Sequence, residues 1–236
     1  MKNTILFLFC TLLAFGSKAQ SLNGAWEGYH TSKSGENLKS VSIFTEGYQV
    51  TTTYDARTGK FVDTKGGSWK ISGDTLKEVV EFDSANPNAV GAEVSFKISI
   101  NDSMLEIVVS DIKYKRIDDG TPGALEGAWL MSGRVVNGET STRDTSGPRK
   151  TMKILSGTRF QWIAYDTATK QFMATGGGTY TTINGKYVEN IEFFSRDDSR
   201  VGMELTFNYS LTNANWHHSG LSSKGEPINE IWSKRL

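Results

Sequence analysis

The sequence predicts an all-β protein made of two tandem antiparallel up-and-down β-barrels of about eight strands each. The first observation behind this prediction is a repeat, because the Gly-Ala-Trp motif at 24–26 returns at 127–129. The second is the alternation of apolar and polar residues, which is typical of strands with one buried face. The third is the regular spacing of turn signals between the alternating runs, a pattern typical of sandwiches and barrels.

The repeat keeps a constant offset of 111 residues over a long block. Outside that block the offset is 103 at the Gly-Ala-Trp motif and 119 at the basic pairs 115–116 and 234–235. The second unit therefore carries two insertions of eight residues, one between Trp129 and Ile154 and one near residues 220–227. The matching positions include Tyr54 with Tyr165, Phe61 with Phe172, Glu78 with Glu189, and the Glu-Phe pair at 81–82 with the pair at 192–193.

Each unit has about a hundred residues, the size of a domain. The expected domains are one barrel over residues 20–118, a linker over 119–124 and a second barrel over 125–236. Alternation is clearest at 92–100 in the first unit and at 203–209 in the second, and the Asn-Gly pairs at 137–138 and 184–185 indicate tight hairpin turns. Because the linker is short, we expect the two units to touch.

Residues 1–19 are expected to be a signal peptide. Lys2 supplies the positive start, residues 5–15 form the apolar run, and Ser17 and Ala19 place small residues where a signal peptidase reads them. Cleavage near Ala19 would also remove Cys10, the only cysteine. The mature protein is therefore expected to be periplasmic or secreted and to contain neither thiol nor disulfide.

Charge gives no reason to expect a nucleic acid or an anionic membrane surface as partner. Without Lys2 and Lys18 the chain has 24 basic and 26 acidic side chains, a net charge of −2. No other apolar run is long enough for a transmembrane segment in the mature chain. The oligomeric state is left open by the sequence.

The ends of each unit resemble the lipocalin-like (calycin) superfamily. Each unit opens with Gly-x-Trp and closes with a Lys-Arg pair. The units are shorter than classical lipocalins and look closer to uncharacterised lipocalin-like secreted proteins of bacteria. The resemblance implies that an arginine of the closing strand covers the tryptophan of the first, so Arg116 would cover Trp26 and Arg235 would cover Trp129 by cation–π contact.

The alternation of inward and outward side chains along the strands predicts one carboxylate inside each barrel. Glu78 shares a strand face with apolar residues in the first unit, and Glu189 does so in the second. A buried carboxylate must be paired, protonated or used. A location near a hydrated barrel mouth is the alternative for both residues.

The second unit replaces ordinary core residues of the first by Trp and His, which are typical of ligand cavities. The replacements are Thr51 by Trp162, Leu105 by Trp216 and Ile107 by His218. We therefore expect the first unit to be scaffold and the second to bind a small apolar or amphipathic ligand. The expected ligand-binding residues are Trp162, Tyr180, Glu189, Trp216 and His218. Ordinary barrel packing of the tryptophans, and a hydrogen-bonded core His218, are the structural alternatives.

Two other functions stay open. A carbohydrate-binding module would need an exposed aromatic platform, for which Tyr165, Phe172 and Trp232 are candidates. A lipocalin-like enzyme could use His218 and Glu189 as acid and base. No metal site or cofactor is expected, because the adjacent histidines 217 and 218 point to opposite faces of a strand and neither a P-loop nor a cysteine nucleophile occurs.

Overall fold

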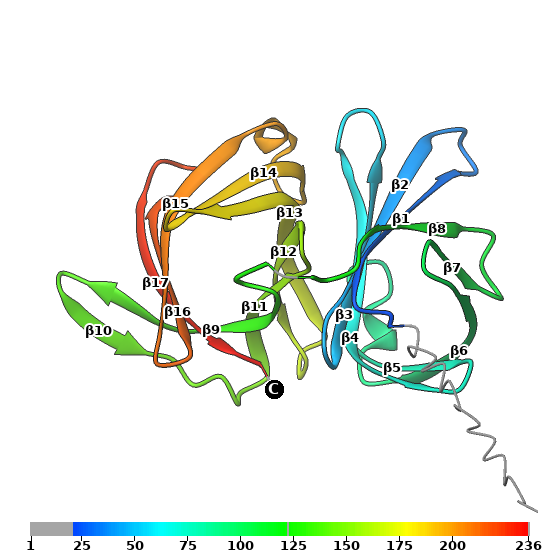
Figure 1. Ribbon diagram of the computed structural model, residues 1–236, viewed down its shortest axis with the longest axis horizontal. Coiled ribbons are helices and arrows are strands. Elements are labelled where there is room, and N and C mark those ends of the chain that lie inside the picture. The colour runs from blue at the N-terminus through cyan, green and yellow to red at the C-terminus, as the bar shows by residue number, and fades with distance from the viewer. Residues whose placement is uncertain (1–20, 122, 236) are drawn as a thin grey trace, which may run out of the picture.

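The computed structural model describes residues 21–121 and 123–235, which form two closed eight-stranded antiparallel β-barrels in tandem (Figure 1). The predicted fold class is confirmed. The signal peptide predicted at residues 1–19, including Cys10, lies outside the described residues. Within the described part of the chain, no helix has both the length and the apolar character needed to span a membrane.

In the first barrel each strand pairs with the next, and the last strand closes on the first. A short 3-10 helix, η1 (Pro87–Ala89), connects the fifth and sixth strands. The strands are β1 (Gly24–Thr31), β2 (Asn37–Phe44), β3 (Tyr48–Asp55), β4 (Phe61–Ser72), β5 (Thr75–Asp83), β6 (Glu93–Ile100), β7 (Met104–Ile107) and β8 (Lys113–Asp118).

The second barrel repeats this order and adds one strand. The additional strand β10 (Glu139–Thr142) lies in the first insertion and forms a hairpin with β9 that projects away from the first barrel (Figure 1). Pairing of β9 with β17 closes the barrel, and η2 (Asp198–Arg200) repeats η1. The other strands are β9 (Gly127–Val136), β11 (Arg149–Leu155), β12 (Arg159–Asp166), β13 (Gln171–Ile183), β14 (Lys186–Phe194), β15 (Glu204–Thr212), β16 (Asn215–Leu221) and β17 (Pro227–Lys234).

The repeated glycines occupy positions that other residues would strain or block. Gly24 and Gly127 open the first strand of each barrel with φ angles of 116° and 120°, which L side chains rarely adopt. The Gly-Gly pairs at 66–67 and 177–178 lie at matching bulges, where a Cβ on Gly67 or Gly178 would collide with a backbone carbonyl oxygen of the neighbouring strand. The sequence repeat therefore preserves backbone geometry.

The closing strands cover the tryptophans differently in the two barrels. The Arg116 guanidinium lies over the Trp26 ring at 3.9 Å, as expected. The expectation that Arg235 covers Trp129 is wrong, because Lys234 pairs with Trp129 across β17 and β9 and places its Nζ 5.2 Å from the ring. One residue further along, the side chain faces outward from the barrel, so Arg235 reaches the first barrel instead.

The two barrels contact each other, as expected, through an approximately two-fold arrangement of matching residues. The Tyr165 hydroxyl donates to Glu81 at 2.6 Å, and the equivalent Tyr54 hydroxyl donates to Glu192 at 2.6 Å. Phe61 and Phe172, which are also equivalent, stack on each other with 6.0 Å between ring centroids. A residue that packs against its own counterpart marks the local two-fold axis.

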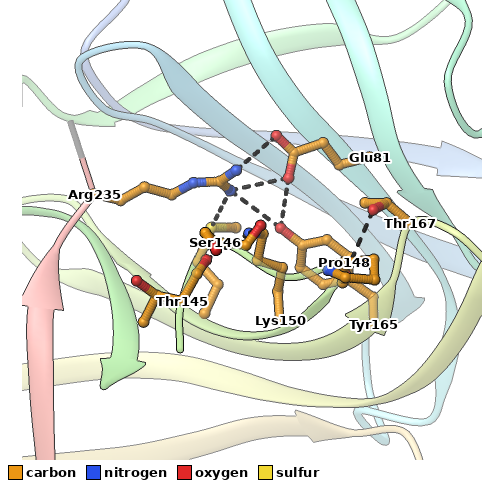
Figure 2. Close-up of polar contacts among 9 residues, drawn as sticks. Glu81, Thr145, Ser146, Pro148, Lys150, Tyr165, Thr167 and Arg235 are labelled. Carbon is orange, nitrogen blue, oxygen red and sulfur yellow. Dashed lines mark hydrogen bonds and ion pairs between the residues drawn. The ribbon is translucent and has the colours of Figure 1, made fainter. Parts of the chain in front are cut away.

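Arg235 strengthens one half of this interface. Its guanidinium donates to both carboxylate oxygens of Glu81 at 2.9 Å and to the Tyr165 hydroxyl at 3.1 Å (Figure 2). On the other half, Arg159 donates to Glu192 at 2.5 Å. Each interface carboxylate therefore has a largely buried cationic partner, which compensates for its partial removal from water.

The interface also accounts for the aromatic residues expected on an open surface. Tyr165 is fully buried against Phe82 of the first barrel, and Phe172 lies on the two-fold axis. Trp232 is buried inside the second barrel. The predicted exposed platform of Tyr165, Phe172 and Trp232 is therefore wrong.

Asp118, at the end of β8, holds the connection between the barrels in place. Its carboxylate accepts hydrogen bonds from Ser156 at 2.8 Å and from the Thr158 backbone N–H at 3.0 Å, both in the turn between β11 and β12. The last residue of the first barrel is thus fixed to the second.

We expect Tyr54→Phe and Tyr165→Phe each to lower the free energy of unfolding by about 1–3 kcal/mol, since each removes a hydrogen bond to a partly buried carboxylate. Burial, reinforced by the neighbouring carboxylate, raises the pKa of both hydroxyls well above the ordinary value, so both remain donors. Urea denaturation at neutral pH measures the effect. Unchanged stability in both variants would contradict the assigned role of these bonds.

Candidate functional site

Both barrels are hollow. The first contains a cavity of about 400 Å³ and the second one of about 260 Å³. The first unit was expected to be scaffold, yet it contains the larger of these two cavities, both of which open to solvent. Cavities that hold small ligands are commonly about 300–1,000 Å³. The first cavity lies near the lower end of that range and the second lies just below it, so both suit only a small molecule.

The walls of the second cavity are mostly apolar. Trp162 on β12 packs edge-to-face against Phe194 on β14, with 5.5 Å between ring centroids. This contact exists because the strand facing Trp162 carries Gly176, where a Cβ would meet the indole. The remaining apolar wall residues are Ile191, Leu205, Phe207, Ile228 and Trp232.

A buried ion pair lies at the polar side of this cavity. The Lys153 Nζ donates to Glu189 Oε1 at 2.8 Å, and both side chains are almost fully buried. Four aromatic rings surround the ammonium at 4.9–5.8 Å from their centroids, a cation–π cage that offsets part of its desolvation. The rings belong to Tyr187, Phe207, Trp216 and Trp232.

His218 lies beside this ion pair with only 2% of its surface exposed. Its Nδ1 is 3.5 Å from Glu230 Oε2, and among the described residues neither ring nitrogen has a hydrogen bond of good geometry. Burial, helped by the Lys153 charge, lowers the pKa of His218 below its ordinary value. The imidazole is therefore neutral at pH 7 and can both donate and accept a hydrogen bond.

Other buried polar atoms around the cage are also unpaired within the described part of the chain. They are the indole N–H groups of Trp216 and Trp232 and the hydroxyl of Tyr187, which lies near the Glu189 carboxylate without a hydrogen bond of good geometry. Unpaired buried polar groups are rare in folded proteins because each costs about 1–3 kcal/mol. Their concentration around one cavity makes this region the candidate binding site.

The predicted site residues fall into two groups. Trp162, Glu189 and His218 line the second cavity. Trp216 lies behind the wall and packs against His218 with 5.3 Å between ring centroids. Tyr180 is buried in the core and donates to the Ser156 carbonyl at 2.6 Å, just as the equivalent Trp69 of the first barrel donates to the Thr45 carbonyl.

The sequence missed several residues of this site. The predicted His218–Glu189 pair is replaced by two separate pairs, because Glu189 binds Lys153 and His218 lies against Glu230. Ser222 and Ser223 line the cavity from the second insertion. Arg200 holds that loop by donating to the Ser223 carbonyl, so this insertion lies at the opening of the cavity.

The first cavity has a different chemistry. Glu78 on β5 is buried and accepts a hydrogen bond from the Gln49 amide at 2.6 Å. Hydroxyl groups line much of its wall, from Ser40, Ser42, Thr51, Thr53 and Tyr114. Across residues 21–121 and 123–235, no three His, Cys, Asp or Glu side chains are grouped closely enough to hold a metal ion.

Residues 124–235 match the model of the family described as "Domain of unknown function (DUF4488)". The match starts just before β9 and ends just after β17, so it covers one complete barrel. A search of curated proteins found no match. The family description names no activity.

Substituting the equivalent carboxylates should affect stability differently. We expect Glu189→Gln to lower the free energy of unfolding by about 3–5 kcal/mol, because it leaves the buried Lys153 ammonium unpaired. Glu78→Gln leaves no cation unpaired, because Glu78 has no ion-pair partner among the described residues. Burial raises the pKa of Glu78, so its ionised form reduces stability as pH rises through the folded-state pKa.

At pH 7, Glu78→Gln should therefore leave the stability unchanged or higher. Urea denaturation of the two variants measures the contrast. An equal decrease in the free energy of unfolding in Glu78→Gln and Glu189→Gln would contradict the prediction.

His218 should make the protein less stable in mild acid. Because its folded-state pKa is lowered, the unfolded chain binds its proton first as pH falls below about 6.5, and stability decreases over that range. His218→Gln should remove this decrease, whereas His217→Gln on the opposite face of the same strand should retain it. Thermal unfolding from about pH 8 to about pH 5 tests the prediction. The same pH dependence in His218→Gln and wild type would contradict it.

Proposed function

We propose that this protein is an exported, lipocalin-like binding protein whose second barrel holds a small amphipathic molecule. The observation that carries the proposal is the second cavity, whose apolar walls meet a cluster of buried polar atoms without partners in the described chain. A solid core would not retain such atoms, since each lowers stability. A ligand with a polar end would satisfy those of His218 and Trp232, the two residues of this cluster that line the cavity.

The polar side of the cavity favours a hydrogen-bond acceptor on the ligand. Trp232 offers an unpaired N–H, and Lys153 has one hydrogen-bond acceptor among the described residues, Glu189. Neutral His218 can donate one further hydrogen bond. A carbonyl, ester or carboxylate group would fit these donors, with the apolar remainder of the ligand against Trp162 and Leu205.

The lipocalin-like and export parts of the proposal rest on separate observations. Two closed eight-stranded antiparallel barrels are compatible with a lipocalin-like fold, and the Arg116–Trp26 contact agrees with the family resemblance. Export rests on the sequence of residues 1–19.

A ligand panel with a matched pair of variants tests the binding site. Decanoate, indole-3-acetate and their methyl esters should raise the thermal unfolding temperature of the wild type and change its tryptophan fluorescence, since Trp162 and Trp232 line the cavity. We expect Trp162→Ala to weaken binding by about 10- to 100-fold through lost apolar contact. Thr51→Ala, at the equivalent position of the first barrel, should bind as the wild type does.

Two results would count against the proposal. One is the absence of stabilisation of the wild type by every member of the panel. The other is equal binding by Trp162→Ala and wild type, which would place the ligand elsewhere.

A further inference from the structure

Each barrel buries a glutamate at an equivalent position, but among the described residues only one of the two carboxylates has a cationic partner. Glu78 pairs with Trp69 across β5 and β4, and Glu189 pairs with Tyr180 across β14 and β13, so the two glutamates are equivalent in the structure as well as in the sequence. Glu189 has a cation of its own, the Lys153 ammonium at 2.8 Å.

In the first barrel the position of that lysine is occupied by serine. Lys153 lies opposite Trp129 in the β9–β11 pair, and Ser42 lies opposite Trp26 in the β1–β2 pair. Within residues 21–121 and 123–235, no Lys, Arg or His nitrogen lies within 4.0 Å of the Glu78 carboxylate. Its hydrogen-bond donor is the neutral Gln49 amide, which cannot balance the charge.

The larger cavity occupies the space where the lysine would be. The four rings around the Lys153 ammonium have equivalents in the first barrel, and all four equivalents line the first cavity together with Ser42 and Glu78. They are smaller on average, with Leu76 for Tyr187, Phe96 for Phe207, Leu105 for Trp216 and Tyr114 for Trp232. The first barrel therefore keeps the carboxylate and much of the apolar wall while leaving out the ammonium.

The other charged groups at the first cavity do not supply the missing cation. Asp63 adds a second acidic group, and burial raises its pKa. Lys65 lines the cavity, and its charge favours the ionised form of Glu78 from a distance, but its side chain is exposed and makes no ion pair with that carboxylate. The Nδ1 of His30 is buried with no hydrogen-bond partner among the described residues. A buried carboxylate without a cation is costly, so the site favours a positively charged guest.

We propose that the first barrel binds a small primary amine whose ammonium group takes the place that the Lys153 Nζ has in the second barrel. The ammonium would pair with Glu78, and the ligand's apolar part would pack against Leu76, Phe96 and Leu105. The second barrel carries its own ammonium, so it does not bind amines in this way. This site lies in a different barrel from the proposed amphipathic-ligand site, and either proposal can fail without the other.

Isothermal titration calorimetry of the full mature chain tests the proposal. The probes are n-butylamine and 2-phenylethylamine, with 2-phenylethanol and 3-phenylpropanoate as the neutral and anionic analogues. We expect the wild type to bind an amine at one site per chain and to discriminate against both analogues. Glu78→Gln should weaken amine binding by about thirty-fold or more, because it removes one partner of a buried charge pair.

Two substitutions exchange serine and lysine between the equivalent positions 42 and 153. Ser42→Lys should abolish amine binding and raise the thermal unfolding temperature, because it gives Glu78 an internal ammonium. Lys153→Ser should create a second amine site that is lost again in the Lys153→Ser/Glu189→Gln double variant. Failure of Lys153→Ser to fold does not affect the test by Ser42→Lys.

The proposal is overturned if the wild type binds neither amine, or if 2-phenylethanol binds as tightly as 2-phenylethylamine. It is also overturned if Glu78→Gln keeps wild-type affinity. A Ser42→Lys variant that is destabilised, or that still binds amines, would show that this position does not bring an ammonium to Glu78.

Discussion

A carboxylate buried inside each barrel sets a requirement that the surrounding residues must meet. In water the charge would be solvated, and inside a barrel it needs a cation, hydrogen-bond donors or a proton. The second barrel meets the requirement with Lys153, whose ammonium in turn needs a cage of aromatic rings. The first barrel supplies a single amide from Gln49 and a wall of hydroxyl groups. The polar groups that line each cavity differ because the two carboxylates are stabilised in these two ways.

The fold was predictable because it depends on patterns that recur along the chain. The constant offset of the repeat and the alternation within strands are local features, and they correctly placed Glu78 and Glu189 on inward faces. The glycine pairs repeat because the same bulge recurs in both barrels. Trp162 and His218, which line the second cavity, were singled out for the same reason, since a comparison of equivalent positions shows where an ordinary core residue has been replaced.

The missed features depend on contacts between distant parts of the chain. Lys153 lies in β11, where residues 152–155 are all buried because the outer face of the strand packs against the first barrel, so alternation is lost there. Arg235 was assigned to Trp129 because a Lys-Arg pair does not reveal which side chain points inward. The pairing of Glu81 with Tyr165 requires the two barrels to be docked, which strand patterns do not describe.

Covalent linkage of the two halves has a consequence for how each can change. The Phe61–Phe172 stack and the paired tyrosine bonds give the contact the form of a symmetric dimer. In an assembly of identical chains, any substitution would appear in both interiors at once. Here Ser42 and Lys153 are encoded separately, so selection can act on one chamber while the other stays constant. A single molecule can thus present two unlike interiors at a fixed separation.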